Sequence, residues 1–284
     1  MAIPSDVLIK WAAVGKSENS KITYAALRKV IEDRYGSNVE MFLQGSYHNS
    51  THVKENSDID IVVINKNIVV NNTLYGMHGQ QALYSWKDEL YKEIQGAQNF
   101  VFKKGAKTIK YSGNTNYVPA DIVPCAYYKN AQIGGAVGTI LYDSTLDRFF
   151  VNYPKQHYDN GTIKSENTNG NYKKTVRMFK NARNEAVKKG LIAAEEVAPS
   201  YFLECLLYNV PNSKYLGNES DVFFNVLKCL WDNKSRLETI KCQNGVQKLF
   251  GYDLLNKITY NKWNVNDAIK FINALANLWN NWGE

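Results

Sequence analysis

The sequence predicts an α+β fold in which a sheet-based lobe packs against a helical lobe, with a cleft between them. Three observations predict it. Helical and strand patterns are mixed up to residue 160, a polar stretch rich in Asn, Thr, Ser and Gly covers 161–171, and only helical patterns follow. We therefore expect a catalytic lobe over 1–160, a helical lobe over 161–284, and a linker at 161–171.

The first lobe is expected to begin with two helices. Ser5 is expected to cap the first, and the second covers 24–35, where Gly36 ends it. These N-terminal helices could pack on the other lobe. A nearly continuous β-branched run at 59–64 is typical of a strand buried on both faces. The remaining elements are strands over 39–43, 108–111, 118–126 and 137–142, and a helix over 81–94.

Helical periodicity dominates the second lobe. The segment 171–189 places Tyr172, Val176 and Phe179 on one apolar face. Further helices are expected over 201–208, 222–231 and 265–282. A sheet lobe followed by an all-helical lobe suits an enzyme whose active site lies in the cleft between them.

Composition narrows the function classes. The chain has 284 residues and a net charge of +7, which favours anionic partners such as nucleotides or nucleic acid. No apolar run approaches the roughly 18 residues that span a bilayer, and the N-terminus lacks the basic-then-apolar order of a signal peptide. The four cysteines form no C-x-x-C pair, as expected of buried thiols in a reducing compartment. We expect a cytoplasmic protein without a membrane partner.

The informative stretch is QGSYHNSTHVKENSDIDIVV, from Gln44 to Val63. Asp58 and Asp60 lie two apart at the start of an apolar strand, so both carboxylates leave the same face. Aspartate is depleted in strands, and two on one face favour a cation with oxygen ligands such as Mg²⁺. The Gly45–Ser46 pair follows a strand and precedes a helical turn, where backbone N–H groups and the hydroxyl can hold a phosphate.

A third carboxylate fits the same chemistry. Asp121 lies in YVPADIVPC, a second apolar strand candidate. If this strand pairs beside the first, Asp121 completes a cluster that can hold two metal ions about 3.5–4 Å apart and drive in-line displacement at phosphorus. An isolated D-x-D is common, and an isolated G-S is usually a turn. The two motifs together are more specific: Asp58 follows Ser46 by 12 residues, and a lone Asp lies on a later strand. This combination indicates a functional site.

This arrangement resembles the polymerase-β-type nucleotidyltransferases, whose signature is G-S, a spacer, D-x-D and a later Asp. More narrowly, it resembles the CD-NTase family, the bacterial relatives of cyclic GMP-AMP synthase. The supporting segments are YPKQHYDNGTIKSENTNGNYKKTVRMFKNARNE and PSYFLECLLYNVP. Within them, HYDNG and SYFLECLLYNVP are most similar to the branch of the family called clade E. The resemblance reaches from about residue 40 to residue 211.

The resemblance also implies roles for single residues. Gln44, Gly45 and Ser46 would bind nucleotide, Lys180 would contact the triphosphate, Ser200 would contact donor phosphates, and Tyr201 would stack on the donor base. Asn167 and Asn169 would select bases, since an amide presents both a donor and an acceptor.

Each of these residues also has a structural interpretation. Lys173, Arg177 and Lys180 form a basic stripe that by itself describes a solvated helix face. Ser200 and Tyr201 can be a helix start with a core tyrosine, and the two asparagines can be turn residues. His48 and His52 are four apart, but no third zinc ligand is evident.

By resemblance, the chain is an Mg²⁺-dependent enzyme, with two ions or Mn²⁺ in their place, that joins NTPs into a cyclic di- or oligonucleotide and releases pyrophosphate. The family implies a role in bacterial antiphage signalling (CBASS), with a separate effector for the product, no nucleic-acid activator and a monomeric enzyme. Two alternatives stay open: transfer of a nucleotide to RNA or protein, and a catalytically silent nucleotide-binding module. The chain lacks a long RNA-binding extension, and it keeps all three aspartates.

Overall fold

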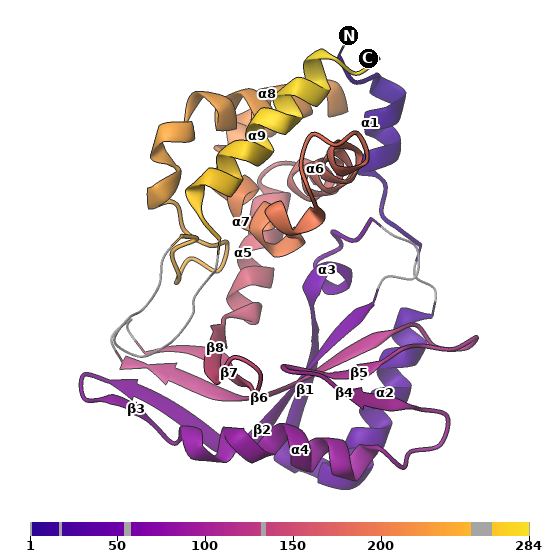
Figure 1. Ribbon diagram of the computed structural model, residues 1–284, viewed down its shortest axis with the longest axis vertical. Coiled ribbons are helices and arrows are strands. Elements are labelled where there is room, and N and C mark those ends of the chain that lie inside the picture. Colours follow the sequence, from indigo (N-terminus) through magenta and orange to yellow (C-terminus); the bar gives the residue numbers. More distant parts are fainter. Residues whose placement is uncertain (1, 17–18, 54–57, 132–134, 251–262, 284) are drawn as a thin grey trace.

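The computed structural model describes residues 2–16, 19–53, 58–131, 135–250 and 263–283. Its helices and strands follow the expected order, with a mixed N-terminal half and a helical C-terminal half (Figure 1). The helices are α1 (Ser5–Ala12), α2 (Ser20–Tyr35), α3 (Gly45–His48), α4 (Leu83–Ile94), α5 (Pro154–Glu166), α6 (Asn171–Lys188), α7 (Ser200–Tyr208), α8 (Glu219–Asp232) and α9 (Val265–Asn280). The strands are β1 (Val39–Gln44), β2 (Ile59–Thr73), β3 (Gly76–His78), β4 (Phe102–Lys104), β5 (Ile109–Tyr111), β6 (Ala120–Asn130), β7 (Ala136–Asp143) and β8 (Arg148–Asn152).

The described strands form one mixed sheet with the order β1-β2-β6-β5-β4. The long strands β2 and β6 are parallel neighbours, which brings two apolar segments far apart in the sequence side by side. Strand β1 pairs antiparallel with the other edge of β2, and β5 pairs antiparallel with the other edge of β6. Strands β7 and β8 extend the far end of β6.

Helices α2 and α4 cover one face of the sheet. Leu27 and Ile31 of α2 and Trp86 and Leu90 of α4 are buried against the inward residues of β2 and β6. The opposite face carries a smaller apolar cluster that includes Val62 and faces the helical lobe. Strand β2 is therefore buried on both faces, as the continuous β-branched run predicts.

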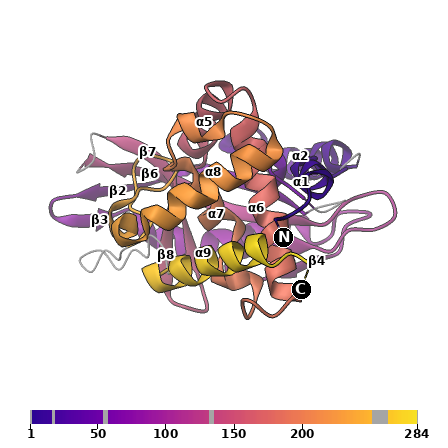
Figure 2. The same ribbon diagram turned by 90° about the horizontal axis from the view of Figure 1, so that it is seen from above.

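The helical lobe has its own core, and the first helix belongs to it. Leu8 and Ala12 of α1 are buried together with residues of α6, α7, α8 and α9. Trp11 contacts Trp282 edge-to-face at 5.5 Å, and both chain ends lie on this lobe (Figure 2). Helix α2, in contrast, packs on the sheet. Among the described residues, no helix has the length and apolar character to cross a membrane.

The expected linker at 161–171 is wrong over most of its length. Helix α5 runs without interruption through residues 160 and 161, and only 167–170 form a turn before α6. The apolar pattern of α5 is weak because its buried residues are His157, Gly161 and Lys164, so the segment is polar without being a loop. A lobe boundary at 160 thus falls inside a helix, and the division of the chain there stays a prediction.

Three smaller differences concern element ends and short strands. Ser5 is the first residue of α1 instead of its cap; the cap position is Pro4, and no side chain caps this helix. Strand β2 continues to Thr73, well beyond the expected end at residue 64. Strands β3, β4 and β8 were not expected, and β3 and β4 have only three residues each, too few for a period-two pattern to stand out.

Candidate active site

The sheet register brings the acidic residues together. Asp60 of β2 lies directly opposite Asp121 of β6, and Asp58 lies two residues before Asp60. Because neighbours directly across a pair of strands share one face, Asp60 and Asp121 project to the same side of the sheet. This side faces the helical lobe. Two segments some 60 residues apart in the chain therefore place their aspartates side by side on the sheet.

Burial and like charge oppose ionisation at this point. Burial, together with the charges of Asp121 and Asp58, raises the pKa of Asp60 to about 7. Burial also raises the pKa of Asp121, with Asp58 acting in the same direction and Lys110 and the Thr108 hydroxyl opposing it. Neighbouring carboxylates that resist deprotonation favour a bound cation, which would stabilise their charged forms.

The turn after β1 fits tightly against Asp60. Gly45 has a φ of +76°, and a Cβ built on it would lie 2.0 Å from Oδ2 of Asp60. Only glycine allows both the positive φ and the close approach. Gln44, the residue before it, lies opposite Asp60 in the β1–β2 register. The expected Gln44–Gly45–Ser46 segment is therefore in contact with the carboxylate cluster.

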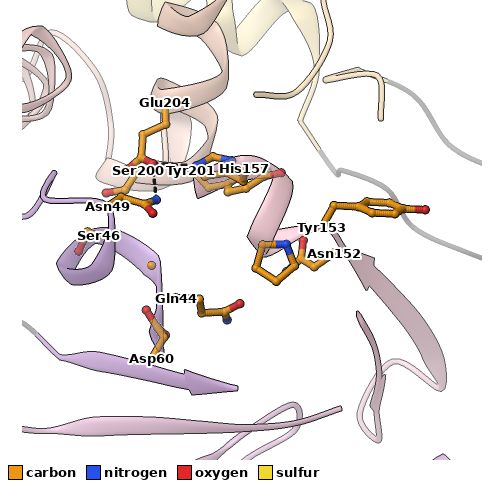
Figure 3. Close-up of a pocket in the computed structure, with 12 residues that line it drawn as sticks. Gln44, Ser46, Asn49, Asp60, Asn152, Tyr153, His157, Ser200, Tyr201 and Glu204 are labelled. Carbon is orange, nitrogen blue, oxygen red and sulfur yellow. Dashed lines mark hydrogen bonds and ion pairs between the residues drawn. The ribbon is translucent and has the colours of Figure 1, made fainter. Parts of the chain in front are cut away.

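A cavity of 260 Å³ opens from this cluster towards the helical lobe (Figure 3). The catalytic half of the chain and the helices α5 and α7 both contribute to its wall. Six of the expected site residues line the cavity: Gln44, Gly45, Ser46, Asp60, Ser200 and Tyr201. The remaining lining residues are Asn49, Asn152, Tyr153, Pro154, His157 and Glu204.

Tyr201 reaches the cavity, but its ring is covered on both faces. His157 stacks on it at 4.9 Å between ring centroids, and Trp263 stacks at 5.7 Å. Stacking on a nucleobase therefore requires one of these two rings to move. The expected stacking of Tyr201 on the donor base stays a prediction.

Lys180 does not line the cavity, and its expected contact with the triphosphate stays a prediction. The residue is 1% exposed, and its ammonium donates to Glu204 Oε1 at 2.7 Å and to Thr51 O at 3.1 Å. Arg177 of the same stripe donates to the carbonyl oxygens of Ala12 and Ser50. These cations are interior hydrogen-bond donors, because the stripe lies at the junction of the lobes and not on a solvated face.

Glu204 lies at the centre of this network, although the sequence motifs did not predict it as a site residue. It is 3% exposed and accepts hydrogen bonds from Asn49, Thr51, His157 and Lys180 at 2.6–2.9 Å. Burial by itself would raise its pKa, but Lys180 and His157 hold the pKa of Glu204 well below its usual range. An acidic residue in the apolar helix SYFLECLLY is the sequence signal that could have identified it.

The expected base-selecting asparagines lie elsewhere. Asn167 and Asn169 are exposed in the turn after α5, and Asn169 has a φ of +51° typical of a turn residue. His157 lines the cavity ten residues before Asn167, about 15 Å away along the helix axis. Neither asparagine lines the cavity, and their selection of bases stays a prediction. His48 stacks on Tyr158 and His52 bonds to the carbonyl of Gly15, so they do not face one another as zinc ligands.

The acidic cluster fits a divalent cation that is shared with a substrate. Within the described part of the chain, no three acidic, histidine or cysteine side chains converge closely enough to enclose a metal ion. Mg²⁺ in proteins is commonly held by one or two carboxylates with substrate phosphates and water completing its shell. Asp60 and Asp121 on one face of the sheet, with Asp58 two residues before Asp60 and the pKa of Asp60 raised, match that kind of open site.

Two family models match the chain. A nucleotidyltransferase domain matches residues 25–144, and the cGAS/DncV-like nucleotidyltransferase C-terminal helical domain matches residues 159–280. The first match contains all three aspartates and the Gly45–Ser46 turn. The second contains α6 and α7.

Proteins with similar sequences and structures match over nearly the whole chain. The cyclic UMP-AMP synthase of Rhodothermus marinus is 36% identical over 100% of both chains, and the cyclic nucleotide synthase CdnE01 of Staphylococcus haemolyticus is 32% identical over 99% of this chain and 100% of its own. A structure of the R. marinus CdnE c-UMP-AMP synthase with Apcpp and Upnpp superimposes with a TM-score of 0.83 at 34% identity, covering 99% of this chain and 98% of that one. The Elizabethkingia meningoseptica CdnE cyclic dinucleotide synthase, solved with GTP and Apcpp, gives 0.82 at 26% identity, covering 99% and 100%.

Proposed function

Because the chain belongs to the CD-NTase family of cGAS/DncV-like nucleotidyltransferases, as a clade E CdnE homologue, we propose that Asp58, Asp60 and Asp121 form its metal-dependent catalytic centre. The protein is a cyclic dinucleotide synthase that makes cyclic nucleotides from NTPs. The single observation that supports the site assignment is the register that places Asp60, which lines the cavity, directly opposite Asp121.

In the proposed mechanism the carboxylates of Asp58 and Asp60 hold divalent cations, and Asp121 completes the set. Two Mg²⁺ ions, or Mn²⁺ in their place, would supply Lewis-acid stabilisation of the phosphoryl charge and lower the pKa of the acceptor hydroxyl. The protein orients the acceptor so that this hydroxyl attacks the α-phosphorus of the donor. The Asp121 carboxylate takes the hydroxyl proton, and pyrophosphate leaves on the opposite side.

The donor phosphates are proposed to lie between the lobes. Ser46 and the N–H groups of its turn approach them from the sheet side, and Ser200 approaches from the first turn of α7. Both hydroxyls line the cavity that begins at Asp60. After the first bond forms, the linear product turns in the cavity, and its own triphosphate becomes the second donor.

We further propose that the product acts on a separate effector in bacterial antiphage signalling and that the enzyme works as a monomer without a nucleic-acid activator. The identity of the two bases in the product then determines the signal. The names of similar proteins differ in these bases, from cyclic UMP-AMP to dipurine and dipyrimidine products.

The test supplies all pairs of the four NTPs with Mg²⁺, identifies phosphatase-resistant products by mass, and repeats the reaction with Asp58→Ala/Asp60→Ala. Wild-type protein is expected to give a cyclic product and pyrophosphate, and the variant neither. Undiminished product from the folded variant would remove the site assignment. Product that appears only when tRNA is added would replace the nucleotide acceptor with RNA.

A further inference from the structure

The row of residues that holds the carboxylates continues across the sheet as two lysines. Asp121 lies opposite Lys110 in the β5–β6 register, and Lys110 lies opposite Lys103 in the β4–β5 register. Directly opposite neighbours share a face, so the same side of the sheet carries Gln44, Asp60, Asp121, Lys110 and Lys103 in that order. With strands about 4.8 Å apart, the two lysines start about 5 and 10 Å from Asp121.

The two lysines face each other, and neither forms a close ion pair with a described residue. Both side chains are exposed, and within the described residues neither forms an ion pair within 4.0 Å. Like charges directly opposite across two strands are unfavourable. The adjacent Lys104 points to the other face and pairs with Asp88 at 3.0 Å. Within the described residues, the same short hairpin therefore gives one lysine an ion pair and leaves two without one beside the carboxylates.

Two simpler explanations account for only part of this arrangement. Lys110 lowers the pKa of Asp121 and could serve only as its distant counterion. Lysines on an edge strand also discourage aggregation, which suits Lys103 on β4. Neither explanation requires the two lysines to lie opposite each other on the face of the catalytic row, since either purpose is served by an uncrowded position.

The stereochemistry of the reaction indicates which ligand the two lysines could bind. In-line displacement puts the attacking oxygen and the leaving pyrophosphate on opposite sides of the α-phosphorus. Ser46 and Ser200, which are proposed to hold the donor phosphates, line a cavity whose wall includes Gln44 of β1 and no described residue of β4, β5 or β6. The acceptor must then approach from the β6–β5–β4 side. An acceptor NTP brings an uncleaved triphosphate of its own, which needs cations there.

We propose that Lys110 and Lys103 form a subsite for the 5′-triphosphate of the acceptor nucleotide. The inference rests on the proposed catalytic centre and adds to it a place for the second substrate. In the first step the acceptor hydroxyl forms a bond to the donor α-phosphorus, the bond to pyrophosphate breaks, and the acceptor triphosphate stays intact on the two lysines. The subsite favours nucleoside triphosphates over less phosphorylated acceptors.

The test measures formation of the first bond alone. An α-³²P-labelled 2′,3′-dideoxynucleoside triphosphate is the donor, because it has no hydroxyl with which to accept. The acceptor is one ribonucleoside, supplied as its 5′-triphosphate, its 5′-monophosphate or the unphosphorylated nucleoside. For wild-type protein we expect kcat/KM for the acceptor to rise with the number of phosphates.

Lys103→Gln is the diagnostic variant, because Lys103 is farther than Lys110 from Asp121. We expect it to lower kcat/KM for the triphosphate acceptor about tenfold, through KM, and to leave the unphosphorylated acceptor within about twofold. Lys104→Gln is the matched control, one residue away on the opposite face, and should leave all three acceptors unchanged.

Equal losses of Lys103→Gln for all three acceptors, no loss, or the same loss in Lys104→Gln would overturn the subsite. Failure of the proposed centre looks different: Asp60→Asn would still form the bond, or wild-type protein would join no acceptor. The circular dichroism spectrum and melting temperature of each variant report whether a loss comes from misfolding.

Discussion

Asp60 is the residue at which burial and charge conflict most directly. It lies at the start of β2 between Gln44 and Asp121, and Asp58 is two residues away. A free carboxylate there lowers stability, and the cost persists unless a cation or a proton neutralises it. Residues of this kind are expected where function has been selected over stability.

The metal-free protein should lose stability as the pH rises. The pKa of Asp60 is about 7 in the folded chain, against 3.8 for an ordinary aspartate. Between these values the folded state binds more protons than the unfolded state, so this group makes the protein less stable at pH 8 than at pH 5. In EDTA, Asp60→Asn should raise the melting temperature at pH 8 by on the order of a few degrees and change it little at pH 5.

Differential scanning fluorimetry at the two pH values measures this effect. Ser220→Ala, on the distant helix α8, serves as the control that should show no pH-dependent difference from wild type. A larger gain for Asp60→Asn at pH 5 than at pH 8 would contradict the sign of the pKa shift.

Gly45→Ala should abolish activity while the chain still folds. The new Cβ would lie 2.0 Å from Oδ2 of Asp60 and would have to displace the carboxylate or the turn. Gly190→Ala is the matched control: Gly190 has a similar φ of +72°, but nothing lies within 4 Å of the added Cβ. Both variants should lose about 1 kcal/mol or more from the positive φ, measured by urea unfolding. Only Gly45→Ala should stop pyrophosphate release, and equal activities of the two variants would contradict the role of the close approach.

At this scale the sequence predicted residues whose placement follows from strand geometry. Asp60 and Asp121 could be placed on one face because alternation and strand pairing determine where they point. The burial of Lys180 could not be predicted, because a helical stripe gives the direction of a side chain but not what covers it. Tyr201 was placed at the cavity, but the rings of His157 and Trp263 on its two faces come from other elements and have no local signal.

Among the elements, α7 has the largest influence on the geometry of the site. Its first turn brings Ser200 and Tyr201 to the cavity, and one turn later Glu204 bonds to Asn49 and Thr51 of the catalytic half. The same carboxylate holds His157 of α5 and Lys180 of α6. This network fixes the segment after α3 against two helices of the other lobe.

Glu204→Gln should destabilise the protein by about 3–5 kcal/mol, because it leaves the Lys180 ammonium buried without a counterion. Glu204→Gln/Lys180→Met removes both charges and should recover at least half of that loss. Asp232→Asn breaks an exposed ion pair with Lys228 on α8 and should cost at most about 0.5 kcal/mol.

Guanidinium unfolding of the four proteins at pH 7 gives these free energies. A double variant as unstable as Glu204→Gln would show that the carboxylate matters through its hydrogen bonds to Asn49, Thr51 and His157 and not through its charge.

Element prediction succeeded where apolar periodicity was strong and failed where polar residues are buried. The ends of α6 and α7 lie within a residue of their expected positions. Helix α5 was missed and in part taken for a linker because its inward face presents His157, Gly161 and Lys164. Lys164 is held there by the carbonyl of Val210 and the side chain of Asn212, partners more than 40 residues away.

For the whole molecule, the two halves interlock instead of lying in series. Helix α1 begins the chain but packs on α6 and α8 of the helical lobe, and α5 runs from β8 into that lobe. The α+β class could be predicted from the order of patterns. The partners of α1 on the helical lobe could not be predicted, because the sequence of one helix does not show which other helix its apolar face contacts.

The register of β2 against β6 brings the proposed catalytic carboxylates together. It places Asp60 and Asp121, each at the start of an apolar strand, side by side next to the cavity that Asp60 lines. Groups that act as one unit show losses that do not add, since removing any member disables the whole. Independent groups would instead give losses that multiply.

The most direct measurement is the single-turnover rate of first-bond formation for wild type, Asp60→Asn, Asp121→Asn and the double variant, with saturating Mg²⁺ and NTPs. Each single variant is predicted to lower the rate by at least about 10³-fold, and the double variant to be no slower than the worse single. An Asp121→Asn rate close to that of wild type, or a double variant slowed by the product of the two single losses, would contradict a shared catalytic centre.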